Sequence, residues 1–168
     1  MKRTLLIAML FAVVAGFVFA ETQVGIVLPT KDEPRWIQDQ TQFLDALKTA
    51  GFSAKVLFSQ GDSAKEKANV EALISEGIKV LIICPHDGTA AASAADLAHS
   101  AGVKVISYDR LIRDTTSVDY YVTFDSFEVG KAWGDYLNSK VPAGTKRNNL
   151  YLYAGAASDN NSFIFFEG

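Results

Sequence analysis

The sequence predicts an α/β fold, a doubly wound and mostly parallel sheet with helices on both faces. Short apolar runs of strand length alternate with segments of helical periodicity along the chain. The predicted strands start roughly every 20 to 30 residues, which is the spacing of βαβ units in a parallel sheet. The run at residues 80–84 has no polar alternation, which indicates a strand covered by helices on both sides.

Two strand–helix units open the predicted fold. The first has a strand at residues 23–28 and a helix beginning at Pro34, because a proline suits the first turn, where its missing N–H would be unpaired anyway. The second has a strand at residues 54–58 and a helix capped by the turn at residues 61–63. The apolar residues at helical spacing are Trp36, Phe43, Leu44 and Leu47 in the first helix and Val70, Leu73 and Ile74 in the second.

The next unit carries the most unusual polar residues. Strands are predicted at residues 80–84 and 103–107, and an Ala-rich helix spans residues 89–100 between them. The fourth strand runs directly into Asp109 and Arg110, an oppositely charged pair at the end of a buried element. This pair is either a loop salt bridge or strand-end cap, or a polar clamp for a small ligand.

The last part of the chain continues the alternation. We predict strands at residues 120–124 and 149–153, with a helix between them that Asp125 can cap. That helix carries Val129, Trp133, Tyr136 and Leu137 on one face. The chain stops just after an apolar run at residues 163–166, and finished domains rarely leave such a surface uncovered. We therefore expect the chain to be a fragment of a longer protein.

The N-terminus has the pattern of a secretory signal peptide. Lys2 and Arg3 precede an apolar run at residues 5–20, which ends in the small residue Ala20. The alternative is a membrane anchor, but the run is shorter than the ~20 apolar residues that a spanning helix needs. We expect cleavage after Ala20 and a periplasmic location.

Composition and motifs exclude several classes of function. The formal net charge of −3 argues against nucleic acid or anionic lipid as a partner. The single cysteine, Cys84, excludes an intramolecular disulfide, and its apolar surroundings favour a buried hydrophobe over a nucleophile. His86 and His99 lack further ligands at metal spacing, so we expect no metal site. No phosphate-binding glycine motif or nucleophile elbow is present, so we expect neither a cofactor nor an enzyme.

Three polar loops follow predicted strands, at residues 31–36, 109–110 and 158–161. The carboxyl ends of parallel strands meet at one edge of a sheet, where such folds place their ligands. Arginine offers several donors in one plane, aspartate offers acceptors and asparagine offers both, which suits the hydroxyls of a sugar. The indole of Trp36 can pack against the apolar face of a pyranose. A neighbouring arginine keeps Asp109 ionised, which favours binding over acid–base catalysis.

Each of these residues also has a structural interpretation. Trp36 can be a core residue at the start of its helix, and Lys31 with its acidic neighbours can be a solvated charge run. Asp159 can serve only as the cap of a following helix. The convergence of three loops on one edge favours the ligand site over these separate explanations.

The stretches at residues 24–30, 35–36, 77–83, 102–112 and 159–161 resemble periplasmic sugar-binding proteins of ABC importers. The resemblance is to the branch that binds xylose and multiple monosaccharides. It implies the type I periplasmic binding protein fold, in which two α/β lobes joined by a hinge close over a sugar. Only the N-terminal lobe and the first crossover are present here, and the second lobe is absent.

The resemblance also assigns residues, regions and partners. The implied sugar contacts are Arg35, Trp36, Asp109, Arg110, Asp159 and Asn161, with Lys31 and Asn160 as weaker candidates. The implied division of the chain is a signal peptide at 1–20, the N-terminal lobe at 21–155 and the crossover at 156–168. The implied function is binding of a xylose-, glucose- or galactose-type sugar for import by an ABC permease in the inner membrane. The alternative is a sensing module that presents the sugar to a membrane receptor.

Overall fold

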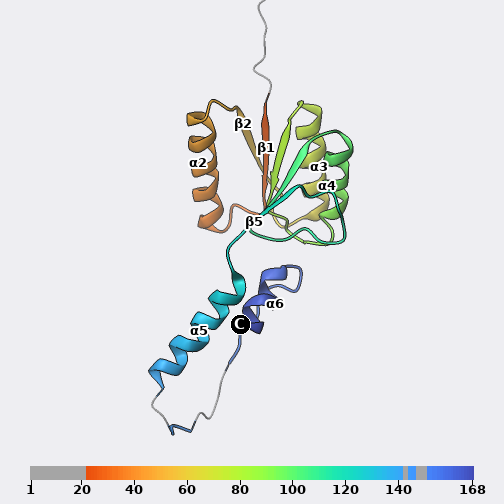
Figure 1. Cartoon of the computed structure of the whole chain (residues 1–168). Helices are drawn as coiled ribbons and strands as arrows, with labels where there is room; N and C mark the ends of the chain where they lie inside the picture. Colours follow the sequence, from red (N-terminus) through yellow and green to blue (C-terminus); the bar gives the residue numbers. More distant parts are fainter. Residues whose placement is uncertain (1–21, 142–143, 147–150) are drawn as a thin grey trace, which may run out of the picture.

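A parallel five-stranded sheet forms the centre of the computed structural model, which describes residues 22–141, 144–146 and 151–168 (Figure 1). The strand order is β2-β1-β3-β4-β5, and every pairing is parallel. The strands are β1 (Val24–Leu28), β2 (Ala54–Phe58), β3 (Val80–Ile83), β4 (Lys104–Tyr108) and β5 (Tyr120–Val122). The predicted fold class is confirmed.

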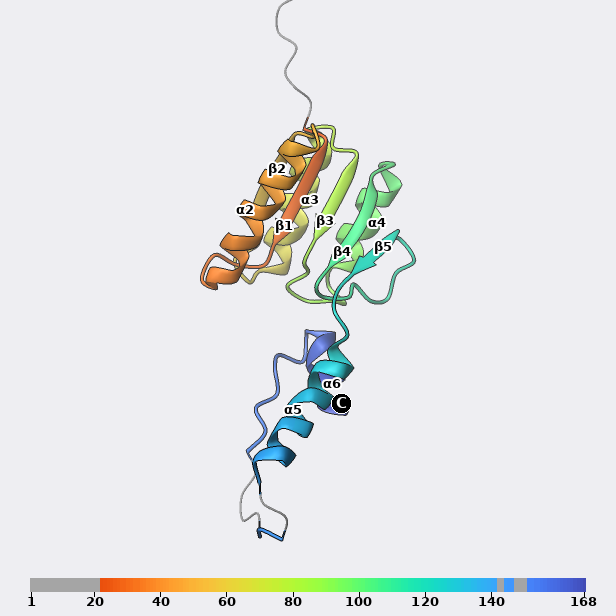
Figure 2. The same ribbon diagram turned by 60° about the vertical axis from the view of Figure 1, so that its left-hand side comes forward.

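Helices cover both faces of this sheet, as the buried central strand predicted. Helix α2 (Pro34–Thr49) packs on one face, and α3 (Ser63–Ser75) and α4 (Ala92–Ser100) pack on the other (Figure 2). All five residues of β1 are buried. The chain leaves β1 toward β2 on one side and returns to β3 on the other. The carboxyl ends of β1 and β3 therefore flank a topological switch point, where α/β sheets bind ligands.

Local sequence signals explain how these elements are placed. Pro34 occupies the first turn of α2, as predicted. The Asp62 side chain accepts hydrogen bonds from the backbone N–H groups of Ala64 and Lys65, so it caps α3. Gly25 lets α3 approach β1 closely, because a Cβ at this position would lie 2.9 Å from a methyl group of Leu73.

Three predicted elements differ from the structure. The strand predicted at residues 120–124 ends at Val122. Helix α4 begins at Ala92 rather than at residue 89, because the Asp87 carboxylate accepts from the N–H groups of Thr89 and Ala90 and holds them in a separate turn. The strand predicted at 149–153 is wrong for residues 151–153, which are exposed and have no strand partner within the described chain. Residues 149–150 lie outside the described chain, as do the predicted signal peptide residues 1–20.

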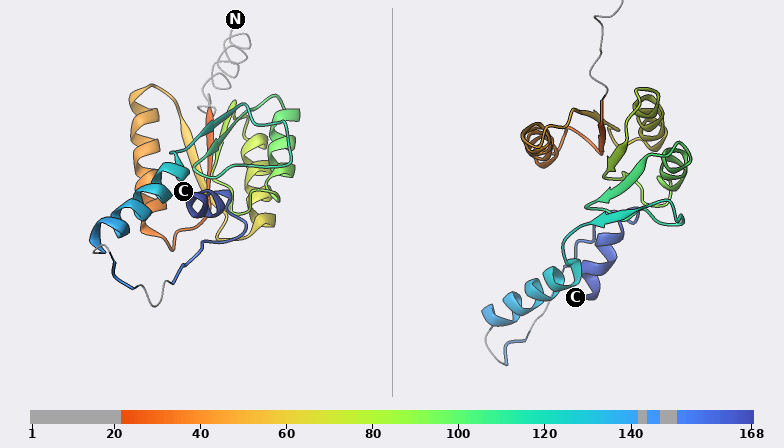
Figure 3. Two further views of the ribbon diagram at one scale, coloured as in Figure 1. Left: turned by 60° about the horizontal axis from the view of Figure 1, so that its bottom comes forward. Right: turned by 45° about the horizontal axis from the view of Figure 1, so that its top comes forward.

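Helices α5 (Ser126–Lys140) and α6 (Asn160–Glu167) pack against each other beyond the carboxyl edge of the sheet (Figure 3). Asp125 caps α5 as predicted, by accepting from the N–H of Glu128. The predicted apolar face of α5 does not reach the sheet, and Trp133 stays 58% exposed. Within the described residues, no helix has both the length and the apolar character needed to cross a membrane.

Candidate functional site

The turn after β4 is fixed by hydrogen bonds to the backbone of Asp109. This residue has φ +63°, a left-handed conformation that costs a non-glycine residue roughly 1–2 kcal/mol. Its N–H donates to the carbonyl of Val122 at 2.8 Å. Its carbonyl accepts from Thr123 Oγ1 at 2.8 Å, Tyr121 Oη at 3.2 Å and Asn161 Nδ2 at 3.0 Å. Contacts from β5 and α6 thus maintain a strained turn, a feature common at functional sites.

The buried side chain of Ser107 also stabilises this turn. The Ser107 hydroxyl donates to the carbonyl of Arg110 at 2.6 Å and accepts from the N–H of Ile112 at 3.1 Å. The N–H of Arg110 also donates to the carbonyl of Tyr108 at 2.7 Å. The backbone on both sides of the Asp109–Arg110 peptide is therefore fixed before any ligand arrives.

Asp109 and Arg110 are adjacent in sequence, but each forms an ion pair with another loop. The Asp109 carboxylate pairs with the guanidinium of Arg35. Arg110 Nε lies 3.0 Å from Asp159 Oδ2, and Arg110 Nη1 donates to the carbonyl of Pro85 at 3.3 Å. The two ion pairs and the hydrogen bond to Pro85 therefore connect the start of α2, the loops after β3 and β4, and the start of α6. We call the set Arg35, Asp109, Arg110, Asp159 and Asn161 the polar clamp.

One donor of the polar clamp is poorly satisfied. Arg110 Nε is close enough to Asp159 for an ion pair, but its N–H is not aimed at the carboxylate oxygen. It is buried without a hydrogen-bond partner among the described residues. Buried polar groups are normally paired, so this N–H is suited to donate to a ligand oxygen.

Trp36 lies in the core, beneath the two arginines of the clamp. The residue is 1% exposed, and its Nε1–H donates to the Glu33 carboxylate at 3.1 Å. The guanidinium carbon lies 4.4 Å from the ring centroid in Arg35 and 5.6 Å in Arg110. These are cation–π distances. The structural interpretation of Trp36 as a core residue is confirmed, and the guanidinium groups of Arg35 and Arg110 both lie over its ring.

Arg35 is the most exposed residue of the clamp, because its side chain is 48% exposed while that of Asp109 is only 6% exposed. Burial alone would lower the pKa of Arg35, but the hydrogen bond and charge of Asp109 outweigh burial and raise this pKa. Arg35 Nε also lies 3.6 Å from Asp39, whose carboxylate accepts from the hydroxyl of Tyr108 at 3.1 Å. We did not predict Asp39, although its position four residues after Arg35 in a helix was a usable signal.

Two residues at the start of α6 complete the clamp. Asp159 caps the helix, because its Oδ1 accepts from the Asn161 N–H at 3.0 Å, and its Oδ2 faces Arg110. Its role as a sugar contact stays a prediction. Asn161 is 3% exposed, and its Oδ1 accepts from the Ser126 hydroxyl at 3.3 Å. Asn160 is half-buried at the first position of α6. The described residues contain no group of three His, Cys, Asp or Glu side chains suited to a metal ion.

Lys31 lies beside the end of β2, where its ammonium is 5.0 Å from the ring centroid of Phe58. It also borders a cavity of about 250 Å³ together with Gln60 and Lys65. The contacts of Lys31 are thus with β2 and its following turn, and its role as a sugar contact stays a prediction.

An open parallel sheet with a polar site at its switch point defines a ligand-binding α/β domain. Within that class, the chain belongs to the family described as periplasmic binding protein domain, whose model matches residues 24–168. The predicted resemblance is confirmed. This is a family of solute-binding proteins.

Relatives with known ligands cover most of this chain. The multiple sugar-binding periplasmic receptor ChvE of Rhizobium radiobacter is 37% identical over 93% of this chain and 45% of its own length. The D-xylose-binding periplasmic protein of Escherichia coli is 30% identical over 88% of this chain and 43% of its own. A carbohydrate transporter solute binding protein from Chloroflexus aurantiacus, solved in complex with D-glucose, is 71% identical with a TM-score of 0.79. The match covers 85% of this chain and 42% of that one. The chain thus spans less than half the length of these relatives.

Proposed function

We propose that this chain is the N-terminal lobe of a periplasmic binding protein that binds a monosaccharide for import by an ABC transporter. The observation that carries the proposal is the polar clamp, which brings ion-paired side chains from separate loops to one edge of the sheet. The family membership and the glucose complex of the 71% identical relative support it.

The clamp has the donors and acceptors that a sugar needs. Arg35 and Arg110 supply N–H donors, Asp109 and Asp159 supply acceptors, and Asn161 supplies both. In the absence of sugar the arginines and aspartates form ion pairs with one another, which orients them. A ring hydroxyl that donates to a carboxylate and accepts from a guanidinium can insert into each pair.

We further propose that the sugar ring displaces the guanidinium of Arg35 and packs on Trp36. The pair of Arg35 and Asp109 is exposed enough on the arginine side for this exchange. Sugar binding would then change the fluorescence of Trp36. A Trp133→Phe variant leaves Trp36 as the single tryptophan and makes the signal specific.

The whole protein would need its second lobe for tight binding. One lobe leaves a face of the sugar in water, where hydrogen bonds exchange with solvent and contribute little net free energy. Domain closure requires contacts that exist only in the closed state, and those come from both lobes.

We propose residues 1–20 as a signal peptide, 21–155 as the lobe and 156–168 as the crossover. This division assigns α5 to the lobe and α6 to the crossover, although the two helices pack against each other. Mass spectrometry of the exported protein tests the cleavage after Ala20.

Binding is tested by NMR titration of the ¹⁵N-labelled chain with D-glucose, D-xylose, D-galactose and L-arabinose. This method detects even millimolar affinities. We expect saturable shifts at the polar clamp with at least one sugar. A folded chain whose spectrum none of the four sugars changes would contradict the proposal.

A second candidate function is sugar sensing, in which the protein presents its ligand to a membrane receptor. The name of the relative from Rhizobium radiobacter, a sugar-binding receptor, favours it. The gene neighbourhood separates the two functions, because permease and ATPase genes indicate import whereas a histidine kinase gene indicates sensing.

A further inference from the structure

One buried carboxylate lies outside the polar clamp and has no role in the proposed function so far. Glu66 is 1% exposed and lies on the face of α3 that also carries Val70 and Leu73. A charged residue in an apolar helical stripe is costly unless its partners compensate for the lost water. The hydrogen bonds of Glu66 show which groups compensate for its burial.

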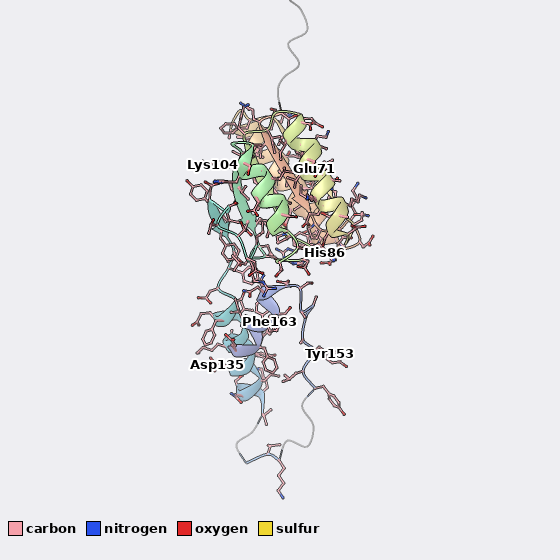
Figure 4. All side chains as sticks on the ribbon, turned by 90° about the vertical axis from the view of Figure 1, so that its right-hand side faces the viewer. Glu71, His86, Lys104, Asp135, Tyr153 and Phe163 are labelled. Atoms are coloured by element: carbon pink, nitrogen blue, oxygen red, sulfur yellow. The ribbon has the colours of Figure 1, made fainter. Side chains whose placement is uncertain are left out.

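Glu66 connects the ends of three strands. Its Oε2 accepts from the backbone N–H of His86 at 2.8 Å and from the hydroxyl of Ser59 at 3.2 Å. Ser59 follows β2, and its own N–H donates to the carbonyl of Leu28 in β1 at 2.9 Å. His86 lies in the loop after β3, at the end of the sheet that faces α6, whereas Glu71 lies farther along α3 (Figure 4).

A single peptide group links Glu66 to the clamp. The N–H of His86 and the carbonyl of Pro85 belong to the same peptide bond. The N–H donates to Glu66, and the carbonyl accepts from Arg110 Nη1 at 3.3 Å. Hydrogen bonds in such a chain polarise one another. A negative charge on Glu66 therefore strengthens the acceptor that holds Arg110.

The electrostatics of Glu66 make its charge adjustable. Burial raises the pKa of Glu66 to about 7, against the opposing effects of the His86 N–H, the Ser59 hydroxyl and the positive charge of Arg110. Asp87, in the loop after β3, raises this pKa further. The same loop also carries the imidazole of His86. A test must therefore distinguish an effect of this imidazole from an effect of Glu66.

We propose that Glu66 is a positioning residue for Arg110, that it acts through the Pro85–His86 peptide group, and that its ionisation strengthens sugar binding at the clamp. This inference rests on the proposed function. Protonation weakens the hydrogen bond to His86 and removes the attraction for Arg110, which then holds a sugar less firmly. By linkage, a bound sugar must in turn favour the ionised form of Glu66.

The test compares D-glucose affinity across pH for the chain and three variants. We expect the dissociation constant of the unaltered chain to increase about fivefold or more between about pH 8 and pH 5.5. Glu66→Gln keeps an acceptor for the His86 N–H without the charge, and its affinity stays at the acidic value throughout. Glu71→Gln, on the exposed face of the same helix, keeps the original pH profile. His86→Gln keeps its peptide N–H and also keeps the profile.

Two results overturn the proposal. One is a pH-independent dissociation constant in the unaltered chain, and the other is a flat profile in His86→Gln, which would assign the effect to the imidazole. If Glu66→Gln does not fold, Ser59→Ala replaces it. Ser59→Ala removes one hydrogen bond to the carboxylate, so the midpoint of the profile must move to higher pH.

A readout without sugar separates this inference from the proposed function. The NMR signal of the Arg110 side-chain N–H should shift with pH in the free chain, with a midpoint near the pKa of Glu66, and stay constant in Glu66→Gln. If no sugar binds but this signal titrates, only the proposed function fails. If sugar binds but neither the signal nor the affinity changes with pH, only this inference fails.

Discussion

The two tryptophans of the chain lie in regions with opposite packing. We use the term sheet lobe for β1–β5 with α2, α3 and α4, without α5. Trp36 is 1% exposed in this sheet lobe, whereas Trp133 is 58% exposed on α5. The sheet lobe has apolar clusters on both faces of its sheet. The pair of α5 and α6 leaves large apolar side chains such as Phe163 and Phe166 exposed at 51% and 66%. The lobe is thus stabilised by its own core, and the helix pair depends more on a few close contacts.

The polar clamp crosses the boundary between these regions. Asp109 and Arg110 belong to the lobe, and Asp159 and Asn161 belong to the helix pair. Binding at the clamp therefore depends on how the pair of α5 and α6 is held against the sheet lobe. The following variants disturb each side separately.

The largest effect is expected for Gly130→Ala. A Cβ at this position would lie 2.1 Å from the carbonyl oxygen of Phe165, so α5 and α6 cannot keep their contact. We expect the helix pair to separate while the sheet lobe stays folded. In a Trp133→Phe background, the fluorescence of Trp36 should remain native, and the side-chain amide signal of Asn161 should move.

Gly134→Ala is the matched control, because a Cβ there meets nothing within 4 Å. It lies on the same helix and should stabilise α5 by up to about 1 kcal/mol through helix propensity. Equal effects of the two variants would show that the contact at Gly130 does not hold the pair together.

The second largest effect concerns the pH dependence of the lobe. The pKa of Glu66 is raised from 4.5 to about 7, so the folded state binds a proton that the unfolded state has already released. The free energy of unfolding should therefore fall as pH rises from about 4.5 and level off above about 7, by roughly 3 kcal/mol in total. Urea unfolding followed at Trp36 measures it. Glu66→Gln should remove this fall, and a fall that persists in the variant would assign it to another group.

The third prediction concerns the arginine that contacts both regions. Arg110→Ala removes the contacts to Pro85 and Asp159 and the donors for a sugar. Hydrogen bonds to charged groups contribute about 1.5–3 kcal/mol, so D-glucose affinity should fall at least tenfold. The circular dichroism spectrum should be unchanged. An unaltered dissociation constant would reduce this arginine to a structural ion pair.

The smallest effect is expected for Asn161→Ala, with Asn160→Ala as its neighbour control. Asn161 is buried and donates to the carbonyl of Asp109, whereas Asn160 is only half-buried. Loss of the buried amide should lower the unfolding free energy by about 1–3 kcal/mol, and the control should change it by less than about 0.5 kcal/mol. Thermal unfolding monitored at Trp133 compares them, and similar losses would contradict a specific role for Asn161.

The sequence predicted the sheet well because its signals are local. Apolar runs, helical periodicity and the capping residues Pro34, Asp62 and Asp125 each act within a few neighbours. The strand expected at 149–153 failed for the opposite reason. A strand needs a partner beside it, and no local pattern guarantees one.

Sequence alone predicted that Asp109 and Arg110 reach the carboxyl edge of the sheet, because they directly follow a parallel strand. Asp159 and Asn161 reach this edge through the start of α6 instead, because residues 151–153 form no strand. Only the tertiary structure decided how the charges pair. Arg35 and Asp109 are 74 positions apart, and their pairing depends on the strand order rather than on spacing. The tertiary structure also placed Trp36 beneath the arginines. It also made Glu66 a buried carboxylate, which contacts the loop after β3 that binds Arg110. Side chains distant in sequence acquire their electrostatic environment only when the packed fold excludes water around them.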